Sequence, residues 1–231
     1  IKTSFALALL LLISCASSQL DQAEQWQSQL HAEHALVGMI WDSQADEFIE
    51  ANELFARTER VSYLLLGEKH DNPDHHALQL RALDHVLQTN TVSTVSFEMM
   101  SSEQQPLLQE LSAYRQSSLE QVNEYLQWDN EGWDWDYYGP LLHSAMQADV
   151  LINAANISNE EMMQVYGAPT AAKIEGVLDE QTMAALEKDI DESHCGMLPE
   201  SQFPAMVRVQ QARDFAMADS LAASSPQQIQ V

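Results

Sequence analysis

Positively charged side chains are scarce in this 231-residue sequence. Ten Lys and Arg residues stand against 35 Asp and Glu residues, which gives a formal net charge of -25. A surface this acidic repels nucleic acids and anionic lipid headgroups, so neither is an expected partner. The acidity itself fits a protein that must stay dissolved in salty surroundings. An anionic ligand would have to be met by a local basic group, because the overall field repels it.

Cysteine, glycine and proline are also sparse. The sequence has two Cys, seven Gly and seven Pro. It contains no glycine-rich phosphate loop, no nucleophile elbow and no zinc-protease helix, so none of the enzyme classes that depend on these motifs is indicated. Two cysteines allow at most one disulfide, and stability must come from a hydrophobic core, for which the chain is long enough.

The N-terminal segment has the features of a signal peptide. Lys2 precedes an uninterrupted apolar run from Phe5 to Ile13, which is too short to cross a bilayer. The run leads into Leu12-Ile13-Ser14-Cys15, which resembles the bacterial lipobox, where the cysteine receives a lipid before cleavage. We therefore predict that residues 1–14 are a signal peptide and that Cys15 is lipidated. The alternative is a signal peptide followed by an incidental cysteine.

A lipid on Cys15 would leave Cys195 unpaired and place the protein in the bacterial cell envelope. Lipoproteins held at the inner membrane usually carry an aspartate after the cysteine, whereas this sequence has Ala16. We therefore expect an outer-membrane lipoprotein that faces the periplasm, attached through its lipid alone. Residues 15–34, which are polar and rich in glutamine, are the expected tether. Residues 35–231 are the expected domain, and the sequence appears truncated at both ends.

The domain begins with a predicted hairpin, followed by an alternation of strands and helices. Apolar runs at 61–66, 91–97 and 150–155 predict buried strands, and Asn72 followed by Pro73 is typical of a helix start. Helices are expected over 73–87, 103–125, 140–147, 159–193 and 204–222, with the hairpin at 35–41 and 47–49 and a last strand near Gln227. This order predicts an α/β fold with a mostly parallel sheet, helices on both faces and a helical insertion at 159–193.

Ligand-type side chains follow the predicted strands. Glu68 and His70 come after the first buried run, Glu98 ends the second, and His76 can point back from the helix toward the same edge. Ligands in open α/β sheets bind beyond the carboxyl ends of the strands, so His70, Glu68 and Glu98 are candidate ligands for a divalent metal. The same histidine can instead be a hydrogen-bonded structural residue.

These residues are similar to a known family. The sequence resembles the ChaN-like haem-binding proteins of the Tiki and EreA superfamily in the motifs Leu66-Gly67-Glu68-Lys69-His70-Asp71-Asn72, Ser96-Phe97-Glu98-Met99 and His194-Cys195-Gly196-Met197-Leu198-Pro199-Glu200. The Trp133 to Pro140 segment and the run from Gln210 through Arg213 to Met217 extend the resemblance. The family pattern also has a second Gly-x-x-His after the final strand, which this sequence does not reach.

The resemblance implies an exported domain that binds haem in haem or iron uptake. The residues that it indicates for the cofactor are His70, Glu68, Glu98, His194, His76, Tyr138 and Arg213. Superfamily relatives use similar Gly-x-x-His and glutamate positions for hydrolysis, in some cases with a metal. A metal-dependent hydrolase is therefore the alternative function, and a lipid-anchored binding module without chemistry is a third. A homodimer is left open.

Three further groups of residues have competing interpretations. The aromatic cluster Trp128, Trp133, Trp135, Tyr137 and Tyr138 can wall a flat ligand, and Tyr can ligate haem iron, but such clusters more often anchor a core. His194 and Cys195 can bind iron or zinc, although Cys195 can equally be an ordinary buried thiol. Arg213 can meet a haem propionate or form a structural pair with a carboxylate.

Overall fold

The computed structural model describes residues 26–58, 60–89, 92–169, 178–222 and 229–231, and the chain divides into two compact units at Arg57. Cys15 and the predicted signal peptide lie outside the described residues. No helix among the described residues is both long and apolar enough to cross a membrane.

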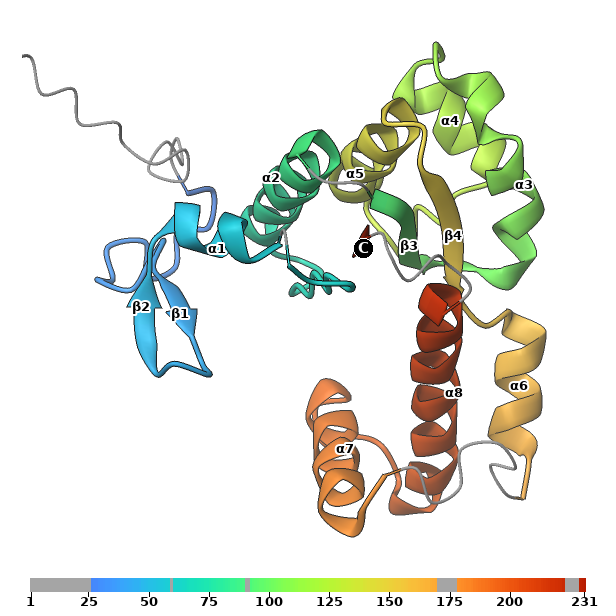
Figure 1. Ribbon diagram of the computed structural model, residues 1–231. Helices are drawn as coiled ribbons and strands as arrows, with labels where there is room; N and C mark the ends of the chain where they lie inside the picture. The colour runs from blue at the N-terminus through green and yellow to red at the C-terminus, as the bar shows by residue number, and fades with distance from the viewer. Residues whose placement is uncertain (1–25, 59, 90–91, 170–177, 223–228) are drawn as a thin grey trace, which may run out of the picture. The chain divides into compact units, whose positions relative to one another are not determined.

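The first unit is a small hairpin followed by a helix. Strands β1 (Ile40–Asp42) and β2 (Glu47–Ile49) pair antiparallel, and α1 (Ala51–Thr58) follows them (Figure 1). The Asp42 carboxylate accepts hydrogen bonds from Gln44 N and Ala45 N in the turn and pairs with Arg57 of α1. The predicted hairpin is therefore confirmed, although its first strand begins at Ile40 rather than at residue 35.

The second unit contains a three-stranded parallel sheet in the order β4-β3-β5. Its strands are β3 (Val92–Ser101), β4 (Leu151–Asn156) and β5 (Ile229–Gln230). Its helices are α2 (Pro73–Thr89), α3 (Gln105–Gln109), α4 (Leu119–Leu126), α5 (Trp135–Gln147), α6 (Asn159–Gly167), α7 (Glu180–Ser193) and α8 (Phe203–Ala222). Short 3-10 turns occur at Ser102–Gln104, Leu111–Tyr114 and Glu200–Gln202. The α/β class with a parallel sheet is confirmed.

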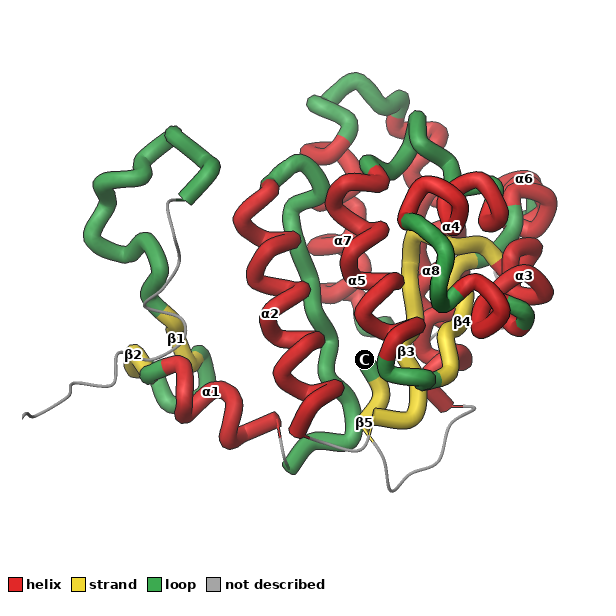
Figure 2. Tube along the Cα trace, turned by 90° about the horizontal axis from the view of Figure 1, so that it is seen from above, coloured by secondary structure: helices red, strands yellow, loops and turns green. Residues whose placement is uncertain are grey.

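The core of this unit lies around β3. Helix α2 packs beside α5, and α8 packs against both β3 and β4 (Figure 2). Leu83 and Val86 of α2 and Leu142 and Ala145 of α5 are almost completely buried, as is Met100 of β3. The helical spacing of these apolar residues gives each helix one buried stripe, and burial of the stripes is what holds the helices to the sheet.

Two expectations about element boundaries are wrong. The run 61–66 is irregular apart from an isolated bridge at Tyr63 and is not buried on both faces. Leu64 and Leu66 pack against the core, whereas Leu65 is 77% exposed, so only one side of the run has a hydrophobic partner. Helix α5 begins at Trp135 rather than near Pro140, because the Asp134 side chain caps it by accepting a hydrogen bond from Asp136 N.

Candidate functional site

The polar centre of the second unit lies in the segment between residue 66 and helix α2. Asn72 caps this helix, since its Oδ1 accepts hydrogen bonds from Asp74 N at 2.9 Å and from His75 N at 3.3 Å. Pro73 occupies the first helical position, where its missing N–H has no partner to lose. The cap fixes where α2 begins and thereby places the residues just before it.

Side chains of helix α2 also form hydrogen bonds with the backbone of this segment. Gln79 Nε2 donates a hydrogen bond to the Leu66 carbonyl at 2.8 Å, and His76 Nε2 donates one to the His70 carbonyl at 3.0 Å. The other ring nitrogen of His76 lies 3.1 Å from Gln79 Oε1, and the ring stacks on Tyr137. His76 is therefore a buried residue whose hydrogen bonds position the segment before α2, and its predicted contact with a ligand stays a prediction.

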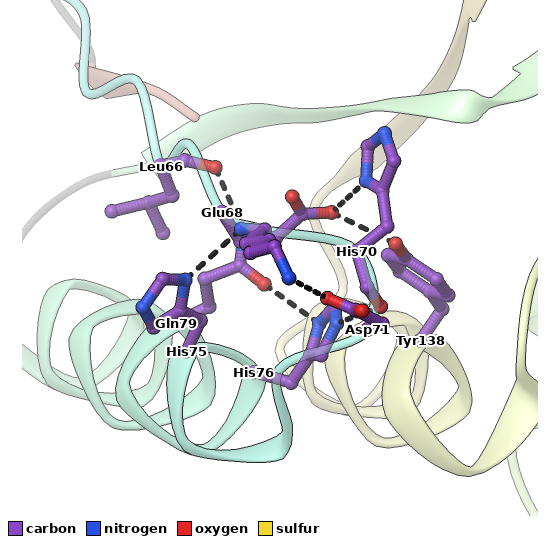
Figure 3. Close-up of polar contacts among 9 residues, drawn as sticks. Leu66, Glu68, His70, Asp71, His75, His76, Gln79 and Tyr138 are labelled. Carbon is purple, nitrogen blue, oxygen red and sulfur yellow. Dashed lines mark hydrogen bonds and ion pairs between the residues drawn. The ribbon is translucent and has the colours of Figure 1, made fainter. Parts of the chain in front are cut away.

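Glu68 connects His70 to Tyr138 (Figure 3). One carboxylate oxygen of Glu68 accepts a hydrogen bond from Tyr138 Oη at 2.8 Å and lies 2.7 Å from His70 Nδ1. The Glu68 side chain is only 4% exposed, whereas that of His70 is 57% exposed. A buried carboxylate thus orients an accessible imidazole, whose edge also contacts Trp133 at a ring-centroid distance of 4.8 Å.

Tyr138 is buried among the aromatic residues of the 128–138 segment. Burial raises the pKa of its phenol well above the ordinary range, and the hydrogen bond to Glu68 and the negative charge of that carboxylate raise it further. Tyr138 therefore stays protonated at physiological pH and acts as a hydrogen-bond donor. The aromatic cluster mainly anchors the core, as the more ordinary interpretation of the sequence predicted.

A cavity of about 360 Å³ adjoins this cluster, within the roughly 300–1,000 Å³ range of small-molecule sites. Glu68, His70 and Tyr138 line one part of it. Much of the remaining wall is apolar and includes Leu64, Leu66, Leu83, Met99, Leu141 and Leu221. An apolar wall beside an accessible imidazole suits a flat hydrophobic ligand that carries a metal.

Glu98 of β3 also lines the cavity, so the structure brings together Glu68, His70, Glu98 and Tyr138 of the predicted site. Among the described residues, however, no group of three His, Cys, Asp or Glu side chains is arranged to hold a metal ion. Glu68, His70 and Glu98 share the cavity, and their role as ligands of a divalent metal stays a prediction.

His194 and Arg213 do not line the cavity in the part of the chain that the structure describes. His194 caps the end of α7, where its Nδ1 bonds the Ile190 carbonyl at 2.7 Å. Arg213 of α8 directs Nη2 to Met162 Sδ at 3.7 Å rather than to a carboxylate. Cys195 is exposed and not the buried thiol that was one alternative. Their proposed roles toward a ligand stay predictions.

Sequence reasoning assigned no role in the site to several lining residues. Ser96 of β3 borders the cavity with a buried hydroxyl that has no hydrogen-bond partner, and Met217 and Ser220 of α8 line it from another element. Ser96 and Met217 stand in the motifs that resemble the family, although neither of them was assigned a role in the site from its motif. Ser220 gave no signal, because only the packing of α8 against the sheet brings it there.

A family model for haem-binding uptake proteins, described as the ChaN group of the Tiki superfamily, matches residues 54–231. The chain belongs to this family. Among solved structures it is similar to ChaN of Campylobacter jejuni, in a structure described as cofacial haem binding, with a TM-score of 0.73 and 22% identity. The match covers 83% of this chain and 78% of that chain, and it shows a shared fold. A comparison with curated proteins gives no match.

Proposed function

We propose that this chain binds haem for uptake or handling in the bacterial envelope, with the macrocycle against the apolar wall of the cavity. Its membership of the haem-binding uptake family supports this function. The observation that carries it is that a buried carboxylate, Glu68, orients an accessible histidine, His70, at the edge of a mostly apolar cavity. No observation on the described residues favours the hydrolase alternative.

His70 is the proposed iron ligand. Its Nδ1 faces the Glu68 carboxylate, which leaves Nε2 as the nitrogen that can bind a metal. A carboxylate on the second nitrogen of a ligating histidine fixes the ring orientation and raises its basicity. The imidazole of His70 would hold the iron of a bound haem, and the leucine and methionine side chains of the wall would contact the porphyrin ring.

Tyr138 supports this arrangement without binding iron. A tyrosine ligates iron as phenolate, whereas Tyr138 is only 1% exposed and its hydroxyl already has a hydrogen-bond partner. Its hydroxyl instead holds the Glu68 carboxylate in place at 2.8 Å. Among the residues that the resemblance indicates, we therefore assign Glu68 and Tyr138 to positioning and His70 to direct contact.

A haemin titration of the purified protein tests this assignment. We expect a shifted Soret band at stoichiometric haemin, with binding at least about tenfold weaker in His70→Ala because the iron loses its protein ligand. His143→Ala is the matched control and should bind like the unaltered protein, because His143 of α5 forms a hydrogen bond with Gln147 and is not among the described residues that line the cavity. Absence of a spectral change in the unaltered protein, or equal binding by His70→Ala, contradicts the proposal.

We further propose that the protein is attached to the outer membrane through a lipid on Cys15, facing the periplasm. The lipobox-like Leu12 to Cys15 sequence after an apolar run supports this proposal. Mass spectrometry of the mature N-terminus should show a diacylglycerol-modified cysteine at its start. An unmodified Cys15, or cleavage at another position, would remove the anchor from the proposal.

A further inference from the structure

The charged side chains around the cavity are of one sign at neutral pH. Among the described residues that line it, Glu68 and Glu98 carry negative charge, and neither Lys nor Arg is present. The Glu68 side chain is only 4% exposed to solvent. Water therefore screens its charge poorly, and a ligand group placed nearby experiences it strongly.

Glu98 extends this negative character along the wall. Glu98 and Ser96 of β3 both line the cavity, and the buried Ser96 hydroxyl has no hydrogen-bond partner among the described residues. Tyr138, whose hydroxyl donates a hydrogen bond to Glu68, lines the same cavity, so Glu98 borders the space that Glu68 and Tyr138 also border. The two carboxylates thus act on the same space.

A ligand carboxylate that entered this space would meet two carboxylate side chains and, among the described lining residues, neither Lys nor Arg. An uncharged ligand edge would instead meet Leu66, Leu83 and Leu141, with no unpaired charge. A ligand that has both kinds of edge therefore enters with its uncharged edge first and keeps its carboxylates outside the cavity. Haem is such a ligand, since its two propionates lie on one edge of the ring.

We propose that this cavity admits only an uncharged edge of an iron porphyrin and that Glu98 is the residue that rejects carboxylate substituents. The selected class is then iron porphyrins with carboxylates on a single edge. Iron porphyrins with carboxylates around the ring are excluded. This inference rests on the proposed function, because it takes an iron porphyrin as the ligand.

The test compares haemin with iron coproporphyrin III, which carries four propionates, by Soret titration of the same protein at low and high salt. We expect the four-propionate compound to bind about tenfold more weakly, or worse, at both salt concentrations. Glu98→Gln should lower the ratio of the affinity for haemin to the affinity for iron coproporphyrin III, because it removes the charge while keeping the size of the side chain. Glu103→Gln is the matched control, because Glu103 is an exposed acid just beyond β3 and should leave the ratio unchanged.

Each outcome decides the inference. Equal affinity for the two compounds in the unaltered protein overturns it, and this measurement does not depend on whether a variant folds. An unchanged ratio in Glu98→Gln also overturns it. A ratio that vanishes at high salt, or that Glu103→Gln narrows as much as Glu98→Gln, assigns the selection to the overall surface charge. If neither compound binds, the proposed function fails and this inference fails with it.

Discussion

Two parts of the second unit, the helices around β3 and the pair α6 and α7, differ in how much apolar side chain they bury. Around β3, helices α2, α4 and α5 bury many large apolar side chains, among them Leu83, Val122 and Leu142. Helix α6 has no buried residue, and α7 buries only Ile190. The polar cluster of the site lies on the packed side, so Glu68, His70 and Tyr138 are held by a close-packed interior.

Helix α8 connects these two parts. It packs against α6 and α7, and it also packs against β3 and β4 (Figure 1). Met217, Ser220 and Leu221, near its C-terminal end, line the cavity. The cavity therefore forms where the C-terminal end of this long helix meets the packed part, and α6 and α7 contribute none of the described lining residues.

The largest expected difference between the two parts is in how much free energy of unfolding is lost when a methionine is replaced by alanine. Met100→Ala on β3 should lower the free energy of unfolding by about 3 kcal/mol, because Met100 is fully buried and its removal leaves a cavity. Met163→Ala on α6 removes the same side chain where it is 62% exposed and should change stability by less than about 0.5 kcal/mol. Urea unfolding followed by near-ultraviolet circular dichroism measures both. Similar losses would show that the two parts are equally packed.

Ionisation of Tyr138 should have a smaller effect, a loss of free energy of unfolding at high pH. Its pKa is raised in the folded state above the ordinary value of 10.0, so above pH 10 the folded chain keeps a proton that the unfolded chain loses. This stabilisation is complete below pH 10 and is lost as the pH rises toward the folded-state pKa, at up to about 1.4 kcal/mol per pH unit. Tyr138→Phe lacks the titrating group and should therefore lose less stability between pH 9 and pH 11.

Urea midpoints of both proteins at the two pH values decide this prediction. Other tyrosines and lysines titrate alike in the two proteins, so the difference between them isolates Tyr138. Equal declines would mean that Tyr138 ionises as readily in the folded chain as in the unfolded one, and that the hydrogen bond to Glu68 does not constrain it.

Much of the fold was predictable because its signals are local. Asn72 and Pro73 marked the start of α2, and apolar runs marked β3 and β4. The run 61–66 was misjudged because its composition matches a strand covered on both faces, yet only Leu64 and Leu66 find partners in the core. Whether a face is covered depends on distant parts of the chain, and local sequence does not contain that information.

The residue types that follow the apolar runs 61–66 and 91–97 can be read without a structure, and they pointed to Glu68, His70 and Glu98 as one group. Their surroundings follow from the packing of the folded chain. It turned Glu68 toward Tyr138, 70 positions away along the chain, and it left His194 and Arg213 outside the cavity lining. The physical reason is that a spacing pattern fixes the side of an element on which a residue lies, whereas the packing of α5 and α8 fixes what that side faces.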